Sequence, residues 1–404
     1  MSNPRLADVF GQPEAVDFLT GVAARGRMAN AYLLYGPAGV GKGTAALAFA
    51  RAMLCERSPG ATAHRAAQGG LFAETQALEP SPTPGDACGA CPACGRSGDL
   101  QHPDLKFLFP VSGEEKELEK TVIETIEAWR QDPWFVFTYE KAASIRLSLT
   151  RELLRDLAFK PFEADRRVVV VRDADRMRED QYSAMLKSIE EPGGSTVWVL
   201  TTSRPTRLPA TIRSRCQRVR FRPLAERMID EVLRERVGVN AASSRLLSAL
   251  SSGSLGRALA LRDTPFYEDR QKALGLLSYA RSGNAAGLWT AVQAVNSFGR
   301  VGRETLRRLI EFQILWQRDL LRARYGGETE AFVHADRKDD ILRAAPAVDA
   351  TEIRRRLMIL EEALRSIEGN VTVDTTLFSA QSRLADPSLS HTEWPRHPSA
   401  RWDY

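Results

Sequence analysis

The sequence is poor in cysteine and histidine and has no long hydrophobic run. Only five residues of each of these two types occur among 404. No apolar segment approaches the ~20 residues that a membrane-spanning helix requires, and residues 1–19 lack the pattern of a signal peptide. We therefore expect a cytoplasmic protein with no membrane partner. In that compartment the cysteines are thiols or metal ligands rather than disulfides.

Neither sign of charge dominates the chain. Lysine and arginine number 56 and aspartate and glutamate 51, which leaves a formal net charge of +5. This balance favours an acidic partner such as nucleic acid only mildly, and an arginine-rich surface without such a partner explains it equally well. The length predicts two or three domains, because one hydrophobic core rarely serves so long a chain.

A glycine-rich loop stands between a predicted strand and a predicted helix. The strand is Ala31–Tyr35, and an alanine-rich helix is expected over Lys42–Leu54. The segment between them fits G-x-x-x-x-G-K through Gly36, Gly41 and Lys42, and Gly39 adds a further glycine. Such glycines let backbone N–H groups face a phosphate, to which the lysine and the helix N-terminus add positive charge. The alternative is a glycine-rich connection with an incidental lysine.

The residue after Lys42 departs from the phosphate-loop pattern. The hydroxyl that ligates Mg²⁺ belongs at this position, but the residue is Gly43. Thr44 stands one place later, where helical geometry rotates the side chain by roughly 100°. The loop therefore predicts binding of the phosphates of ATP, whereas Gly43 argues against a well-formed Mg²⁺ site.

A second nucleotide element follows the apolar run Val168–Val171. In an active P-loop ATPase such a strand delivers an acidic residue for the metal and then a glutamate that positions the attacking water. Here the first is Asp173, but the second position is Ala174, which can neither accept a proton nor orient water. We expect Asp175 to point elsewhere. The alternative is a buried strand with a solvated acidic turn. The site is therefore expected to hydrolyse nucleotide poorly or not at all.

Cysteines gather at Cys88, Cys91 and Cys94, and Cys55 ends the preceding helix. Four thiolates suit a closed tetrahedral Zn²⁺ site, which is structural because it has no open position. His102 is the alternative fourth ligand if Cys55 points away. A redox role for the thiols is the competing interpretation.

Strand patterns end near Pro223 and only helical periodicity follows. Amphipathic helices are predicted over 228–237, 242–250, 255–261, 266–280, 285–295, 303–325 and 351–367. The apolar stripe of 303–325 is typical of a helix that packs in a core. Residues 386–404 are rich in proline and serine, and we expect them to be disordered until a partner binds.

Several motifs resemble clamp loaders. They are Leu186–Pro192 (LKSIEEP), Val199–Ser203 (VLTTS), Leu208–Cys216 (LPATIRSRC), Ala31–Cys55, His102–Leu105 (HPDL) and Lys160–Phe162 (KPF). Across most of 1–222 the chain resembles the delta-prime family of clamp-loader subunits of bacterial DNA polymerase III. The resemblance implies an α/β AAA+ P-loop module over 1–222, with a parallel sheet flanked by helices and a zinc module at 55–94. It further implies an all-α lid at 223–264, an all-α collar at 265–380 and a disordered tail at 381–404. Two insertions, 56–86 and 111–144, depart from the family.

The resemblance also implies site residues and partners. Arg215 of the Ser-Arg-Cys motif would act as an arginine finger in the nucleotide site of a neighbouring subunit. Thr202 and Arg257 join the loop residues and Asp173 as nucleotide-binding candidates. Arg213, Arg218 and Arg220 compete with Arg215, and an ordinary surface ion pair is the alternative role for that residue. Cys216 is expected to be a small buried side chain rather than a nucleophile. The expected partners are the gamma/tau and delta subunits in a hetero-oligomeric ring, the sliding clamp, and primer-template DNA through the complex.

Three hypotheses follow. The first is a regulatory clamp-loader subunit of the polymerase III holoenzyme with absent or weak ATPase of its own. The second is an active ATPase subunit of the gamma/tau type, against which Gly43 and Ala174 argue. The third is a zinc-dependent DNA-binding protein that retains a nucleotide fold.

Overall fold

The computed structural model describes most of the chain in two compact units. One unit comprises Met1–Gly238 with Ser251–Ala260, and the other comprises Val239–Leu250 with Leu261–Tyr404. The residues described are 4–26, 28–58, 83–112, 115–132, 134–137, 143–190, 195–282, 285–295, 302–326, 332–368, 373–386 and 388–389.

The first unit is built on a five-stranded parallel sheet with strand order β2-β3-β4-β1-β5. The strands are β1 (Ala31–Tyr35), β2 (Leu105–Leu108), β3 (Arg167–Val171), β4 (Thr196–Thr202) and β5 (Gln217–Arg220). All of β3 is buried, as its run of four valines predicts for a strand covered on both faces. In the register, Val169 pairs with Trp198 and Leu33 with Leu200. The short strand β2 was not among the predicted strands.

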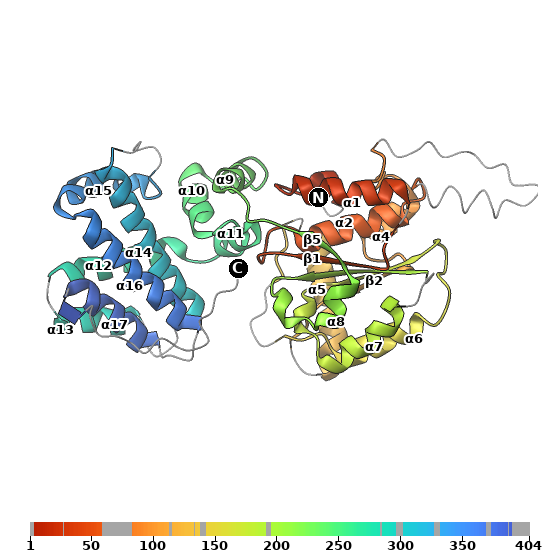
Figure 1. The fold of residues 1–404 in the computed structure, drawn as a ribbon. Helices are drawn as coiled ribbons and strands as arrows, with labels where there is room; N and C mark the ends of the chain where they lie inside the picture. The colour runs from red at the N-terminus through yellow and green to blue at the C-terminus, as the bar shows by residue number, and fades with distance from the viewer. Residues whose placement is uncertain are drawn as a thin grey trace, which may run out of the picture. The chain divides into compact units, whose positions relative to one another are not determined.

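Helices cover both faces of this sheet (Figure 1). On one face lie α1 (Pro13–Arg25) and α2 (Lys42–Leu54), and α4 (Pro92–Gly98) packs beside α2. On the other lie α6 (Leu147–Asp156), α7 (Glu179–Glu190) and α8 (Ala210–Arg215). Successive strand residues alternate between the two cores: Leu34 and Val170 face α2, whereas Leu33 and Val171 face the α7 side. Helix α2 is buried along most of its length, as its alanine content predicts.

The expected insertion 111–144 forms a small structure of its own. Helix α5 (Leu118–Gln131) follows the 3₁₀ turn η2 (Glu115–Glu117), and an antiparallel bridge joins Val111 to Ser144. An apolar cluster beside β2 includes Phe109, Val111, Leu118 and the ring of Phe137. Of the other expected insertion, 56–86, only 56–58 and 83–86 are among the residues described. There Asp86 accepts hydrogen bonds from the backbone of Leu6 and Ala7.

Short elements complete the first unit. They are the 3₁₀ turns η1 (Leu6–Asp8), η3 (Ala174–Arg176) and η4 (Pro205–Arg207), and the helices α9 (Glu226–Glu235) and α11 (Leu255–Arg262). Of the three helices in the expected lid, α9 and most of α11 group with the sheet. The third, α10 (Ala241–Leu250), groups with the second unit.

The second unit is helical throughout its described residues. Besides α10 it contains α12 (Phe266–Ser282), α13 (Ala285–Val295), α14 (Arg303–Arg324), α15 (Lys338–Ala344), α16 (Ala350–Glu368) and α17 (Val373–Ala385), with turns η7 (Ala335–Arg337) and η8 (Ala345–Ala347). Helix α14 contributes Leu306 and Ile310 to the core, as predicted. Helix α17 runs through Ala385 with Leu384 buried, so the start of the expected tail at 381 is helical because its apolar residues pack.

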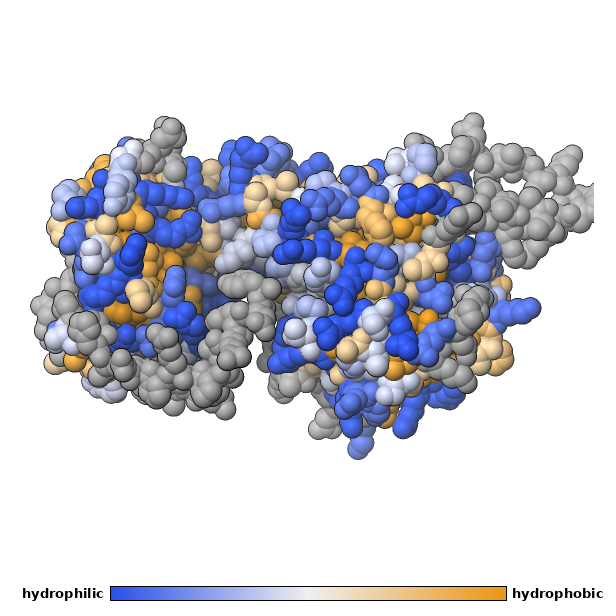
Figure 2. Space-filling model, in the orientation of Figure 1, coloured by the Kyte–Doolittle hydropathy of each residue, from blue (hydrophilic) through white to orange (hydrophobic). Residues whose placement is uncertain are grey.

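Polar residues are also buried in this unit. Arg308 pairs with Asp269 at 2.7 Å, and the buried Asp319 carboxylate accepts the backbone N–H groups of Val333 and His334. On the face drawn in the space-filling view, hydrophilic residues predominate on both units, and hydrophobic residues are interspersed among the hydrophilic ones (Figure 2). Among the described helices none combines the length and the apolar character needed to cross a bilayer. The architecture confirms the predicted α/β P-loop module accompanied by helical structure.

Candidate nucleotide and metal sites

The glycine-rich loop lies at the carboxyl end of β1, where parallel sheets bind ligands. A Cβ added at Gly36 would come within 2.2 Å of the Phe221 carbonyl oxygen, and one at Gly39 within 2.2 Å of Ser254 Oγ. Both residues have a positive φ, 147° and 71°, which side chains rarely tolerate. Gly41, which directly precedes α2 and caps its N-terminus, has a φ of 96°. The glycines are therefore required by the shape of the loop.

Lys42 is folded into this loop. Its ammonium donates a hydrogen bond to the Gly36 carbonyl at 2.8 Å and another to the Pro37 carbonyl. Burial lowers the pKa of Lys42 to about 8, although the nearby Asp173 carboxylate partly opposes this shift. At the N-terminus of a thirteen-residue helix, this ammonium is suited to an anion, which would relieve its poor solvation.

Helix α11 closes over the loop from outside. The Gly256 N–H donates to the Gly39 carbonyl at 2.9 Å, and a Cβ on Gly39 would lie 3.3 Å from the Arg257 nitrogen. Arg257, a candidate for nucleotide binding, is thus brought next to the phosphate loop by its backbone. Thr44, in contrast, is exposed to solvent.

The place of a metal-ligating hydroxyl is occupied by a guanidinium. A Cβ added at Gly43 would come within 2.4 Å of Arg172 Nη1. The Arg172 Nε lies 3.6 Å from Asp173 Oδ2, and its Cζ lies 4.1 Å from the centre of the Phe137 ring. The residues present do not fit Mg²⁺, because Gly43 supplies no hydroxyl ligand and the Arg172 cation lies beside the other expected ligand, Asp173.

The end of β3 departs from a hydrolytic site. Asp173 adopts a left-handed conformation (φ 48°) and its N–H donates to Thr201 Oγ1. Ala174 is fully buried in the apolar cluster, and Tyr182 donates a hydrogen bond to its carbonyl. Asp175 is also buried at this edge. Its two oxygens accept from Thr202 Oγ1 at 2.7 Å and Arg204 Nε at 2.9 Å. Thr202 is therefore joined to a carboxylate.

Arg215 is exposed at the end of α8. Its Nε lies 2.7 Å from Glu190 Oε1, and its Nη1 donates to the Thr211 carbonyl. It therefore pairs within its own chain, as the ordinary surface interpretation expects. Among its competitors, Arg218 and Arg220 are exposed on the edge strand β5. Burial raises the pKa of Cys216 to about 12, so this residue is a thiol rather than a nucleophile.

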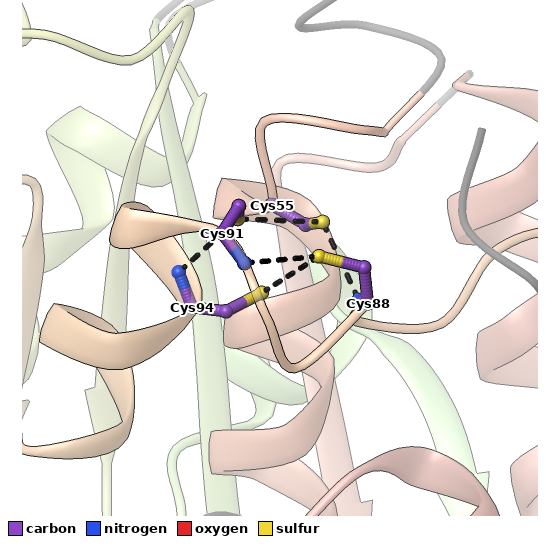
Figure 3. Close-up of side chains that lie close together, drawn as sticks. All are labelled: Cys55, Cys88, Cys91 and Cys94. Atoms are coloured by element: carbon purple, nitrogen blue, oxygen red, sulfur yellow. Dashed lines mark hydrogen bonds between the residues drawn. The ribbon is translucent and has the colours of Figure 1, made fainter. Parts of the chain in front are cut away.

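Four cysteine side chains converge between α2 and α4 (Figure 3). The sulfurs of Cys55, Cys88, Cys91 and Cys94 all lie within 4.8 Å of one another. The Cys55–Cys91 distance is 4.0 Å and the Cys88–Cys94 distance is 3.9 Å. A tetrahedron with Zn–S bonds of about 2.3 Å has edges of about 3.8 Å. The four thiols therefore have the arrangement needed to hold a metal ion such as zinc.

Backbone groups support these sulfurs. The N–H groups of Cys88, Cys91 and Cys94 point at the sulfurs of Cys55, Cys88 and Cys91, respectively, at 3.4–3.5 Å. Hydrogen bonds among the sulfurs lower the pKa of Cys91 and raise the pKa values of Cys55 and Cys94, because without a metal one thiolate accepts from its two neighbouring thiols.

His102 is not the fourth ligand of this group. Its Nδ1 accepts a hydrogen bond from the Asp104 N–H, and its Nε2 lies 3.1 Å from Glu163. Both ring nitrogens are thus used, and Cys55 completes the set of sulfurs.

Sequence reasoning did not identify Arg172 or Phe137 as site residues. The only available signal for Arg172 was its position directly before Asp173. Phe137 lies in the insertion, and no pattern connects it with the loop.

Comparison with known proteins identifies the family. A family model described as "DNA polymerase III, delta subunit" matches residues 11–77 and 71–225, more than half of the chain. DNA polymerase III subunit delta' of Bacillus subtilis is 24% identical over 368 residues, which cover 90% of this chain and 92% of that protein. The delta' subunit of Pseudomonas aeruginosa is 30% identical over 250 residues, covering 62% and 60%. DNA polymerase III subunit tau of B. subtilis is 23% identical over 358 residues, covering 84% and 54%. The chain therefore belongs to the delta-prime family of DNA polymerase III subunits.

Proposed function

We propose that this chain serves in the clamp loader of DNA polymerase III as a regulatory subunit that grips nucleotide phosphate without hydrolysing it and supplies Arg215 to a neighbour. One observation carries the proposal: the loop around Lys42 is intact, whereas the position of the water-orienting carboxylate is the buried Ala174. Without that carboxylate the site has no group that activates water. Any contribution of this chain to catalysis must then be made at the nucleotide site of another subunit of the assembly.

The role of Arg215 is consistent with its surroundings. The side chain is 40% exposed and its partner Glu190 is 46% exposed. Such an exposed pair contributes only about 0–1 kcal/mol, so a phosphoryl group of a neighbour can displace it at little cost. A guanidinium in that position stabilises the charge that develops during phosphoryl transfer.

The proposed partners are gamma/tau and delta subunits in a hetero-oligomeric ring, which acts on the sliding clamp at primer-template DNA. The named relatives are delta' and tau subunits, which supports an assembly of this kind. We further propose that zinc at the four cysteines is structural, because all four protein ligands are sulfur and no open position remains.

The test uses the complex assembled with its gamma/tau and delta subunits. Arg215→Ala is expected to leave the complex intact on gel filtration. It should also remove most hydrolysis at the neighbouring site, where an arginine finger contributes roughly 10³–10⁵ in rate. Arg178→Ala, which removes an equal charge from a side chain that is 72% exposed, is the matched control.

Two results would count against the proposal. Clamp- and DNA-stimulated ATPase that is equal in Arg215→Ala and Arg178→Ala complexes would remove Arg215 from the mechanism. Robust ATPase of the isolated chain, abolished by Lys42→Ala, would favour the active gamma/tau type instead. The intact loop around Lys42 is the observation that favours the active ATPase as a second candidate function.

A further inference from the structure

The phosphate loop carries a positive charge of its own where related loops place a metal ion. We propose that the Arg172 guanidinium replaces Mg²⁺, so that this site takes the phosphate chain of a nucleoside di- or triphosphate free of metal. This inference rests on the proposed function only in assuming that the loop holds nucleotide phosphate.

The Arg172 guanidinium lies where a side chain at position 43 would begin. A hydroxyl-bearing residue at position 43 needs a Cβ, and that Cβ would lie 2.4 Å from Arg172 Nη1. This distance is too short for a real Cβ, so a side chain at position 43 would displace the guanidinium, which is the flexible end of Arg172, from its present place. The missing side chain at Gly43 therefore opens the space that the guanidinium fills. The glycine and the arginine, about 130 residues apart in sequence, form one feature.

Charge balance supports the same conclusion. In a metal site, Asp173 would be neutralised by the cation that it ligates. Here Arg172 lies beside that carboxylate instead, at 3.6 Å. Without either cation, the carboxylate would repel the phosphates. Arg172 and Lys42 therefore supply two positive charges for a ligand that carries about four negative ones as metal-free triphosphate.

The chemistry of the guanidinium suits this ligand. Its planar fork can donate two parallel hydrogen bonds to phosphate oxygens. The Arg172 Nε is buried and has no hydrogen-bond partner. The protein itself therefore leaves part of the hydrogen-bonding capacity of the guanidinium unused. Arg172 also lowers the pKa of Lys42, which shows that the two cations face one region.

The insertion 111–144 gains a role from this arrangement. Phe137 belongs to it and presents its ring to the Arg172 Cζ at 4.1 Å. The same ring packs against Phe109 at 5.4 Å and Phe135 at 5.0 Å between centroids. A cation held over an aromatic face is both attracted and oriented. Phe137 is thus a positioning residue for the guanidinium.

Calorimetric titration of the full chain with ATP, once in excess EDTA and once in excess MgCl₂, tests the proposal. The affinity in EDTA should equal or exceed that in MgCl₂. Arg172→Ala should weaken binding in EDTA by about 10- to 100-fold, as expected for lost hydrogen bonds to a charged group. Phe137→Leu keeps an apolar side chain and should weaken binding in EDTA by about 2- to 30-fold.

The controls separate this effect from a general loss of charge or of folding. Arg178→Ala removes an equal charge from a side chain that is 72% exposed and should bind as the wild type does. The double variant Gly43→Ser with Arg172→Ala should bind more tightly in MgCl₂ than in EDTA. Thermal unfolding of each variant verifies the fold, and Phe137→Leu remains informative if Arg172→Ala does not fold.

Three outcomes would overturn the proposal. They are wild-type binding that requires Mg²⁺, equal affinities of Arg172→Ala and Arg178→Ala in EDTA, and no binding of ATP in either solution. None of them would affect the proposed role of Arg215, because that role is measured at the neighbour's site in the assembled complex.

Discussion

Removal of the metal should loosen the cysteine module while leaving the sheet folded. The buried cluster of this module consists of Cys55, Cys91, Cys94 and two alanines, Ala87 and Ala93. Burying two methyl groups contributes only about 2 kcal/mol. A structural zinc ion contributes roughly 10 kcal/mol or more in small domains. The metal is therefore expected to supply most of the free energy that folds residues 83–98.

The sheet has a separate source of stability. Helix α2 buries residues such as Leu47 and Phe49 in a large cluster that includes Val168 and Val199. That cluster contains none of the four sulfurs. After chelation, backbone amides of 87–98 should lose protection from hydrogen exchange. Amides of β1, β3 and β4 should retain their protection. Hydrogen exchange followed by mass spectrometry resolves these segments.

Metal analysis supplies the stoichiometry. The wild-type chain should contain about one zinc ion, because four sulfurs form one closed tetrahedron. The double variant Cys91→Ser with Cys94→Ser should contain almost none. Cys216→Ser is the matched control, since Cys216 is buried outside the cluster. Zinc content that is unchanged in the double variant, or equal exchange protection with and without chelator, would refute the reasoning.

Two further predictions concern the nucleotide site. Because burial lowers the pKa of Lys42 to about 8, the ammonium loses its proton as pH rises through that value, and ATP affinity should fall above about pH 8. Titration calorimetry across this range measures the change, and a break that persists in Lys42→Arg would assign it to another group. Ala174→Glu should lower the urea midpoint and restore no ATPase, because it buries a carboxylate at a cost of several kcal/mol. Ala210→Glu, at an exposed position, is its control, and turnover gained by Ala174→Glu would contradict this prediction.

Local patterns were sufficient to predict much of the fold. The valines of β3, the alanines of α2 and the spacing of Cys88, Cys91 and Cys94 each show a strong local signal. Strand β2 (Leu105–Leu108) was missed because its four residues include Lys106 and show no long apolar run. Helix α17 (Val373–Ala385) was not among the predicted helices, and the tail was expected from 381, because the burial of Leu384 depends on contacts with residues distant in sequence.

The candidate site was predicted less completely. The loop glycines and Lys42 follow from one contiguous motif, and the consequence of Gly43 for the metal was apparent from that motif. The role of Arg172 was not, because it depends on Gly43 and Phe137, two residues distant from each other in sequence that the fold brings close to the guanidinium. The burial of Asp175 was not predicted for a similar reason. Its partners Thr202 and Arg204 lie on and just beyond another strand, which only the sheet brings near.

Helix α2 is fastened at both of its ends. Its first residue, Lys42, is bound to the loop that precedes it, and Cys55, which follows its last residue, belongs to the sulfur cluster. In its last turn, the buried Arg51 donates to the carbonyls of Pro4 and Cys94. We expect a helix that is held at both ends to stay in place along its axis when a ligand binds or dissociates. Any movement that reports the occupancy of the loop must therefore pass through the elements that touch it from outside, and among these α11 contacts Gly39 directly.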